Sequence, residues 1–128
     1  MRPEAFRDHL VALLKDSPDV QRVAVVEGGP LPYALSAMVA GREQVWQVIG
    51  QLADGAKHDT PTAPVHGEPA VYTAASVSGA PDAWLGGVIG AAEASVVARV
   101  EVWSVRGRRS AGVTVFFHNG ERVFVRLV

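Results

Sequence analysis

The chain contains no cysteine, and this absence excludes every chemistry that depends on a thiolate. Disulfide frameworks, thiolate zinc sites, iron–sulfur clusters and cysteine nucleophiles all need that residue. A chain of 128 residues that is 48% hydrophobic buries about two thirds of its unfolded surface, so it folds without such aids. We therefore expect one globular domain over residues 1–128.

An excess of charge of either sign is also missing. Twelve basic and thirteen acidic side chains give a net charge of −1, so nucleic-acid or anionic membrane binding would need a local patch. The longest apolar stretch, residues 83–100, is interrupted by Glu93 and Arg99 and is too short to span a bilayer. The first residues lack the apolar core of a signal peptide. We expect no membrane partner and a cytoplasmic location, or a virion if the chain derives from a phage.

In the first half of the chain, hydrophobic periodicity predicts one helix and several strands. Residues 3–16 have helical spacing and stop at Ser-Pro, whereas residues 20–26 contain VAVV, a β-branched run suited to burial on both faces. Alternation over residues 33–40 favours a strand, although the alanine content would tolerate a helix. Residues 43–53 fit the helical template better, with a strand as the alternative.

The second half predicts another helix followed by a three-stranded meander. The helix starts at Pro81, and its glycines, four residues apart at 86 and 90, indicate a close-packing surface or a soft helix. Asn119-Gly120 favours a two-residue type I′ turn between the last two strands. The predicted fold is α+β: a single domain whose antiparallel sheet is covered on one face by two or three helices. The predicted strands are 96–105, 113–118 and 121–127.

A long connection over about residues 56–80 holds the residues that most resemble metal ligands. His58, Asp59, His66 and Glu68 have suitable spacing, and H-x-E opens the zinc-deaminase signature, but its P-C-x-x-C half is missing. Three prolines stiffen the segment, so we interpret it as a connector with no metal or cofactor, containing a short strand in AVYTAASV. It remains open whether the connector is a lid, a binding loop or a spacer.

Other catalytic patterns are weak. Ser76 and Ser78 lie outside any G-x-S-x-G elbow, and no two acids share an apolar setting that would shift a pKa. The glycine-rich EGGP and LGGVIG stretches do not precede a helix, as a phosphate loop must. We expect a protein that is not an enzyme; a small metal-dependent or hydrolytic enzyme is the least favoured alternative.

The final hairpin predicts a contact surface. A two-residue turn would pair Phe117 with Arg122 and Val115 with Phe124, which gathers large apolar side chains on one face. Arginines that border aromatic residues are typical of protein interfaces, so a partner or a second copy is expected there. In the alternative, the long connector folds over this face. The predicted interface residues are Val113, Val115, Phe117, Arg122, Phe124 and Arg126.

The stretch VRGRRS forms the one basic cluster. Arg106, Arg108 and Arg109 would lie at a hairpin tip near Trp103, where guanidinium groups could bind a phosphate or nucleic acid. The alternative is an ordinary solvated turn, and we predict that it is mostly exposed.

The order of elements, with a PLPY entry to the second strand, is similar to that of tail-terminator proteins of long-tailed phages. The resemblance implies assembly into a ring at the end of a tail tube and favours a strand over residues 43–53. We expect a non-catalytic protein-binding or self-assembling module of a bacterium, phage or mobile element. The alternatives are an accessory nucleic-acid-binding protein and a tail-terminator-like ring protein.

Overall fold

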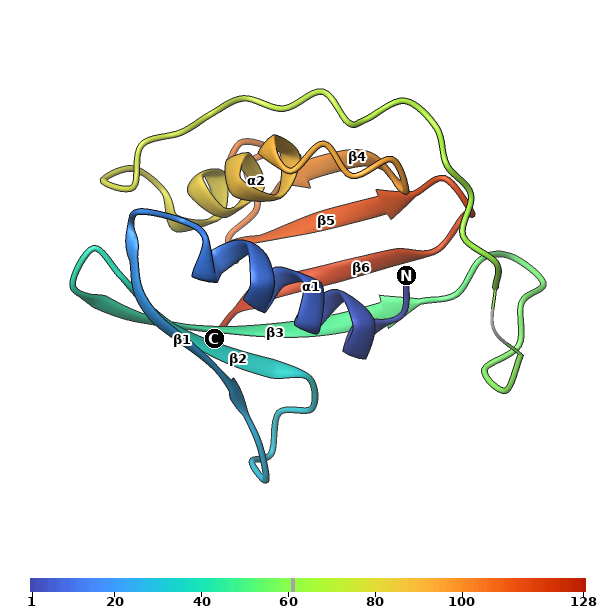
Figure 1. Cartoon of the computed structure of the whole chain (residues 1–128), viewed down its shortest axis with the longest axis horizontal. Helices are drawn as coiled ribbons and strands as arrows, with labels where there is room; N and C mark the ends of the chain where they lie inside the picture. Colours follow the sequence, from blue (N-terminus) through green and yellow to red (C-terminus); the bar gives the residue numbers. More distant parts are fainter. Residues whose placement is uncertain (61) are drawn as a thin grey trace.

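The computed structural model describes residues 1–60 and 62–128 and contains two helices on a six-stranded antiparallel sheet. The strand order is β1-β2-β3-β6-β5-β4, and both helices lie on the same face (Figure 1). The predicted α+β class and the C-terminal meander are confirmed. No described helix is long and apolar enough to cross a membrane. The elements are α1 (Pro3–Lys15), β1 (Val20–Val26), β2 (Ala34–Val39), β3 (Arg42–Gln51), α2 (Pro81–Ala91), β4 (Val97–Val102), β5 (Gly112–Phe117) and β6 (Arg122–Leu127).

Helix α1 forms as its periodicity predicts and supplies a large part of the core. Pro3 occupies the first turn, where the missing N–H removes no hydrogen bond. Phe6, Leu10 and Leu14, one helical turn apart, are fully buried against the sheet. The Phe6 ring meets the Phe117 ring edge to face, with 5.9 Å between their centroids. Helix α1 therefore fixes which face of the sheet becomes the core.

Two predictions for the first half are wrong. Strand β1 has the predicted bounds, but it pairs with β2 alone at the edge of the sheet, so it is not buried on both faces. Residues 42–51 form strand β3 and not a helix, because Ala40 and Gly41 both adopt positive φ and make a two-residue hairpin turn. The chain must then return antiparallel to β2, and β6 pairs with its other side.

Glycines allow α2 to pack closely on both of its sides. A Cβ on Gly86 would lie 2.7 Å from Cγ2 of Val102 on β4, and a Cβ on Gly90 would overlap the Tyr72 side chain. The interpretation of these glycines as a close-packing surface is confirmed.

The turn between β5 and β6 differs from the predicted one. Phe117 N–H donates to Glu121 O at 2.9 Å, and Gly120 N–H donates to Phe117 O at 3.1 Å. Within this turn Gly120 takes positive φ, which makes a three-residue loop in place of a type I′ turn. The register therefore shifts by one residue: Val115 pairs with Val123, not with Phe124. As a result, the β5 side chains that were predicted to share a face with Phe124 lie on the opposite face of the sheet.

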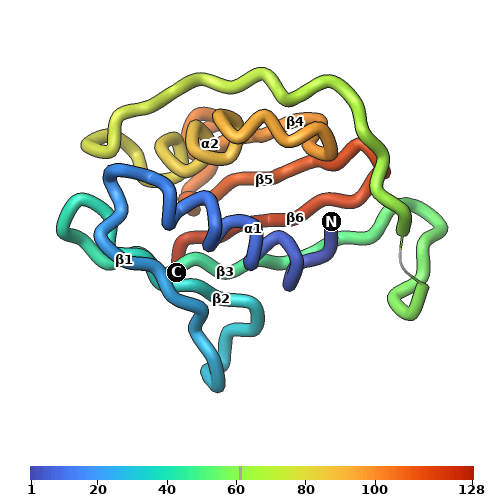
Figure 2. The backbone as a smooth tube through the Cα atoms, in the orientation of Figure 1, coloured from blue at the N-terminus to red at the C-terminus, as the bar shows by residue number. Residues whose placement is uncertain are grey.

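The long connector runs along the outside of α2 (Figures 1 and 2). His66 Nδ1 lies 2.6 Å from Ser95 Oγ, and His118 Nε2 lies 2.9 Å from Glu68 O, so the connector is held by hydrogen bonds at residues 66–68. The short strand predicted within AVYTAASV does not form. The connector packs on the helix layer and leaves the opposite face of the sheet uncovered.

Candidate functional site

The sheet face that points away from both helices carries the side chains that alternate with the core. We call this surface the open face. Ile49 lies opposite Phe124 on β6, and Phe116 on β5 lies opposite Arg122. Ile49 is 44% exposed, and both phenylalanines are half-buried. The centre of the open face consists of Ile49, Phe116, Phe124, Arg99, Arg122, Arg126 and Glu101.

Phe116 is flanked by guanidinium groups from both neighbouring strands. The guanidinium carbon of Arg99, on β4, lies 4.1 Å from the ring centroid, and that of Arg122, on β6, lies 5.0 Å away. Both distances are within the range of cation–π attraction. Arg99 also lies 4.0 Å from the Glu101 carboxylate. The guanidinium groups are thus ordered over an aromatic ring before any partner binds.

Trp103 closes one end of the open face. Its indole N–H donates to Thr114 Oγ1 at 2.9 Å, and its ring packs on Gly112, where a Cβ would lie 2.5 Å from the ring. The guanidinium carbon of Arg108 lies 4.3 Å from the ring centroid. Arg106, by contrast, lines a groove beside β4. The predicted cluster is therefore an exposed turn, as expected, but Arg106 and Arg108 serve different surfaces.

Asp82 positions this hairpin relative to α2. The fully buried carboxylate accepts hydrogen bonds from Ser104 N–H at 2.9 Å, Ser104 Oγ at 2.6 Å and Gly112 N–H at 3.1 Å. The sequence places an acid in the first turn of a helix, where the dipole favours it. Its long-range partners follow only from the fold.

The structure separates the predicted interface residues into two groups. Arg122, Phe124 and Arg126 lie on the open face, and Arg126 donates to Gln47 Oε1 at 2.7 Å. The other three form part of the core, so their predicted place on an exposed face beside Phe124 is wrong; the one-residue register shift is the reason. These buried residues are Val113, Val115 and Phe117.

Sequence reasoning missed Ile49, Phe116 and Arg99 as surface candidates. Ile49 was missed because residues 43–53 were assigned to a helix. Phe116 was missed because the turn was assigned two residues. A three-residue His-Asn-Gly loop with glycine in the left-handed position would have placed Phe116 opposite Arg122.

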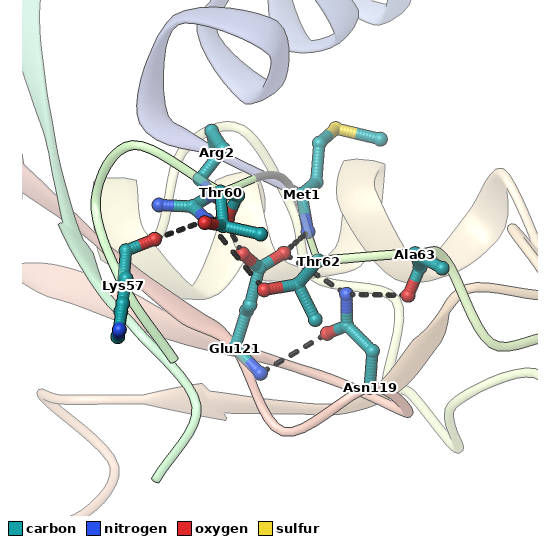
Figure 3. Close-up of polar contacts among 8 residues, drawn as sticks. All are labelled: Met1, Arg2, Lys57, Thr60, Thr62, Ala63, Asn119 and Glu121. Atoms are coloured by element: carbon teal, nitrogen blue, oxygen red, sulfur yellow. Dashed lines mark hydrogen bonds and ion pairs between the residues drawn. The ribbon is translucent and has the colours of Figure 1, made fainter. Parts of the chain in front are cut away.

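A buried ionic cluster ties the chain start to the β5–β6 turn (Figure 3). The Glu121 carboxylate, 3% exposed, accepts hydrogen bonds from the Met1 ammonium at 2.6 Å and from Asn119 Nδ2 at 3.0 Å. Arg2 Nε lies 2.9 Å from its other oxygen, and Arg2 also donates to Thr60 O. Burial raises the pKa of Glu121, but these hydrogen bonds and positive charges outweigh burial and lower the pKa overall. The cluster secures the connector's start.

The predicted metal and catalytic candidates do not assemble into a recognisable centre. Within residues 1–60 and 62–128, no three His, Asp or Glu side chains are placed to hold a metal ion. Ser76 Oγ and Ser78 Oγ hydrogen-bond to each other at 2.8 Å. Comparisons with models of protein families, with curated proteins and with solved structures find no match. Function is therefore inferred from the geometry of this chain alone.

Proposed function

We propose that the chain is a non-catalytic protein-binding module and that the open face is its contact surface. The observation that carries this proposal is Phe116, flanked by Arg99 and Arg122 beside Ile49 and Phe124. The helices lie on the opposite face, and the connector runs along the outside of α2. Aromatic residues and arginine are enriched in protein interfaces, where they supply much of the binding energy.

The charge of the open face indicates an acidic partner surface. Three arginines and Glu101 give its centre a net charge of +2. Because the whole chain carries −1, the remaining side chains sum to −3. Complementary charge directs association and suppresses wrong partners. The partner we propose therefore presents an apolar patch bordered by carboxylates.

A second copy of the chain could provide such an acidic surface only in a head-to-tail arrangement. Two open faces related by a two-fold axis would bring together two surfaces that each carry a net charge of +2, which is unfavourable. A copy that offers its acidic remainder to the next copy's open face would make a head-to-tail contact, which closes into a ring or continues as a filament. This head-to-tail arrangement is compatible with the tail-terminator-like hypothesis, which expects a strand at the position of β3.

Nucleic-acid binding is the second candidate, and the stacking of Arg108 on Trp103 favours it. Single strands bind through aromatic rings on which bases stack. Here Trp103 lies between Gly112 and Arg108, and guanidinium groups already contact Phe116. A base would have to displace these guanidinium groups to stack on either ring, so the protein-binding proposal ranks first.

Site-directed photo-crosslinking in the host cell tests the proposal. A photoreactive phenylalanine analogue replaces Phe124 or Ile49 on the open face, and Val65 on the connector serves as a control because its exposure, 48%, matches the 44% of Ile49. We expect a discrete protein adduct from the open-face positions and none from position 65. Equal labelling from position 65, or no adduct from the open face, would contradict the proposal; a nucleic-acid adduct would establish the second candidate in its place.

A further inference from the structure

Strand β4 has an unpaired backbone on its outer side because it is the last strand of the sheet. Trp103 N–H donates to Gly112 O at 2.9 Å, so the alternating ladder directs the backbones of Glu101 and Trp103 toward β5. The backbones of Val100 and Val102 then point outward. Among the described residues, no backbone hydrogen bond outside the ladder involves residues 98–102. Two N–H and two C=O groups are therefore available to another strand.

A groove of about 350 Å³ runs beside this edge, and we call it the edge groove. On the connector, its lining residues are Val71, Tyr72, Thr73 and Ala75. Helix α2 contributes Ala83 and Gly86. The edge groove thus places an unpaired strand edge beside a second, extended segment of the chain.

The connector wall of the edge groove is fixed in place. Tyr72 packs directly on Gly90, and Thr73 O lies 3.3 Å from the position that a Cβ on Gly87 would occupy. Further along the connector, Gly67 N–H donates to Ser95 O at 2.8 Å. A groove that exists before binding requires less ordering of the protein, which favours affinity.

The lining of the edge groove selects the chemistry of its occupant. Val71 and Val105, which are 93% and 76% exposed, offer apolar surface to a ligand's side chains. The charged residues of the lining are Arg99, Arg106 and Glu101, a net charge of +1. A peptide in which apolar residues alternate with acids would complement both features.

We propose that the edge groove binds an extended acidic segment of a partner protein, which pairs with β4 as a seventh strand. In such strand addition, backbone hydrogen bonds provide affinity and the alternating side chains provide specificity. Arg99 is the exposed member of its ion pair with Glu101. Charged side chains of this kind keep a free sheet edge from pairing with strands of unrelated proteins. Arg99 and Glu101 belong to both surfaces, but the strand pairing proposed here uses the backbone of β4 and not the apolar centre of the open face.

Amide hydrogen exchange, measured by NMR on the free protein, first tests whether the outer backbone of β4 is unpaired. We expect the amides of Val100 and Val102 to exchange at least tenfold faster than those of Glu101 and Trp103. Addition of the acetylated and amidated peptide TVDVDVT should then slow exchange at Val100 and Val102 at least tenfold. Equal protection of all four amides in the free protein, or no change with the peptide at about 1 mM, the weak end of specific binding, would overturn the proposal.

Alternate N-methylation of the same peptide tests strand pairing directly. In an added strand every second N–H points toward β4, so one of the two alternately methylated peptides should bind like the parent. The other should lose at least tenfold in affinity, because several backbone hydrogen bonds are removed together. Equal affinity of both methylated peptides would show a contact without strand pairing and would overturn the proposal.

Charge reversal within the arginine loop tests the proposed acidity of the ligand. Arg106→Glu should weaken binding of TVDVDVT by about threefold and strengthen binding of the lysine counterpart TVKVKVT by a similar factor, as expected for exposed ion pairs. Arg109→Glu is the control, because Arg109 does not line the edge groove. Equal effects of the two substitutions, or no preference between the two peptides, would refute an acidic occupant.

Discussion

Asp82 and Glu121 are both buried carboxylates, and each collects donors from segments distant in the sequence. Asp82→Ala would remove the acceptor for three hydrogen bonds and leave the buried Gly112 N–H without a partner. We expect the free energy of unfolding, measured with urea, to fall by about 2–4 kcal/mol. Ser104→Ala removes only the hydroxyl donor and should reduce it by about 1 kcal/mol. A smaller effect for Asp82→Ala than for Ser104→Ala would contradict this assignment.

Glu121 should make folding stability depend on pH in the acidic range. Its pKa in the folded chain lies below the ordinary 4.5, so its contribution is fully present above that pH and is lost as pH falls through the folded pKa. Glu121→Gln should lower stability at pH 7 and flatten the acid dependence of the urea midpoint. Glu4→Gln is the control, because Glu4 is exposed and forms only a 3.8 Å pair with Arg7. Identical pH profiles for wild type and Glu121→Gln would refute this role.

At the scale of elements, Gly90 determines how closely the connector lies on α2. Replacing a helical glycine with alanine normally stabilises the helix by about 1 kcal/mol. Here we expect Gly90→Ala to destabilise the protein, because the new Cβ would overlap the Tyr72 side chain. The double variant with Tyr72→Gly should lose less stability in urea than the sum of the two single variants. Additive losses would show that the two residues do not share this contact.

The elements that local signals define were predictable from the sequence, and those that depend on a turn were not. Helices α1 and α2 have apolar or glycine periodicity and start with prolines, so their positions followed directly. The strand identity of β3 depends on the Ala40-Gly41 turn, while its own apolar spacing also fits a helix. For the candidate site, the preference of Asn119-Gly120 for a two-residue turn was overridden by a three-residue loop.

At the scale of the whole molecule, the one-residue shift in the register of β5 against β6 determines which side chains of β5 face the core. A slip by one residue exchanges the two faces of a strand. The observed register buries Val113, Val115 and Phe117 beneath the helices and leaves Phe116 on the open face. The predicted placement on an exposed sheet face therefore holds for the residues of β6 and is inverted for those of β5.

This asymmetry between the faces predicts opposite outcomes for one kind of substitution. Val115→Asp would bury an unpaired carboxylate in the hydrophobic core, so we expect it to abolish cooperative folding, as judged by circular dichroism and urea titration. Ile49→Asp adds its charge at a position that is 44% exposed and should change the free energy of unfolding by about 1 kcal/mol or less.

Ile49→Asp should nevertheless abolish the protein adduct formed from a photoreactive residue at position 124, because it places a carboxylate in the centre of the contact surface. Val65→Asp, with similar exposure on the connector, should leave that adduct intact. If instead Val115→Asp folds and Ile49→Asp unfolds the chain, the faces are the reverse of those described. If both Asp variants fold and the adduct persists in Ile49→Asp, the open face is solvent-exposed surface, and the protein-binding proposal fails while the edge groove still stands on its own tests.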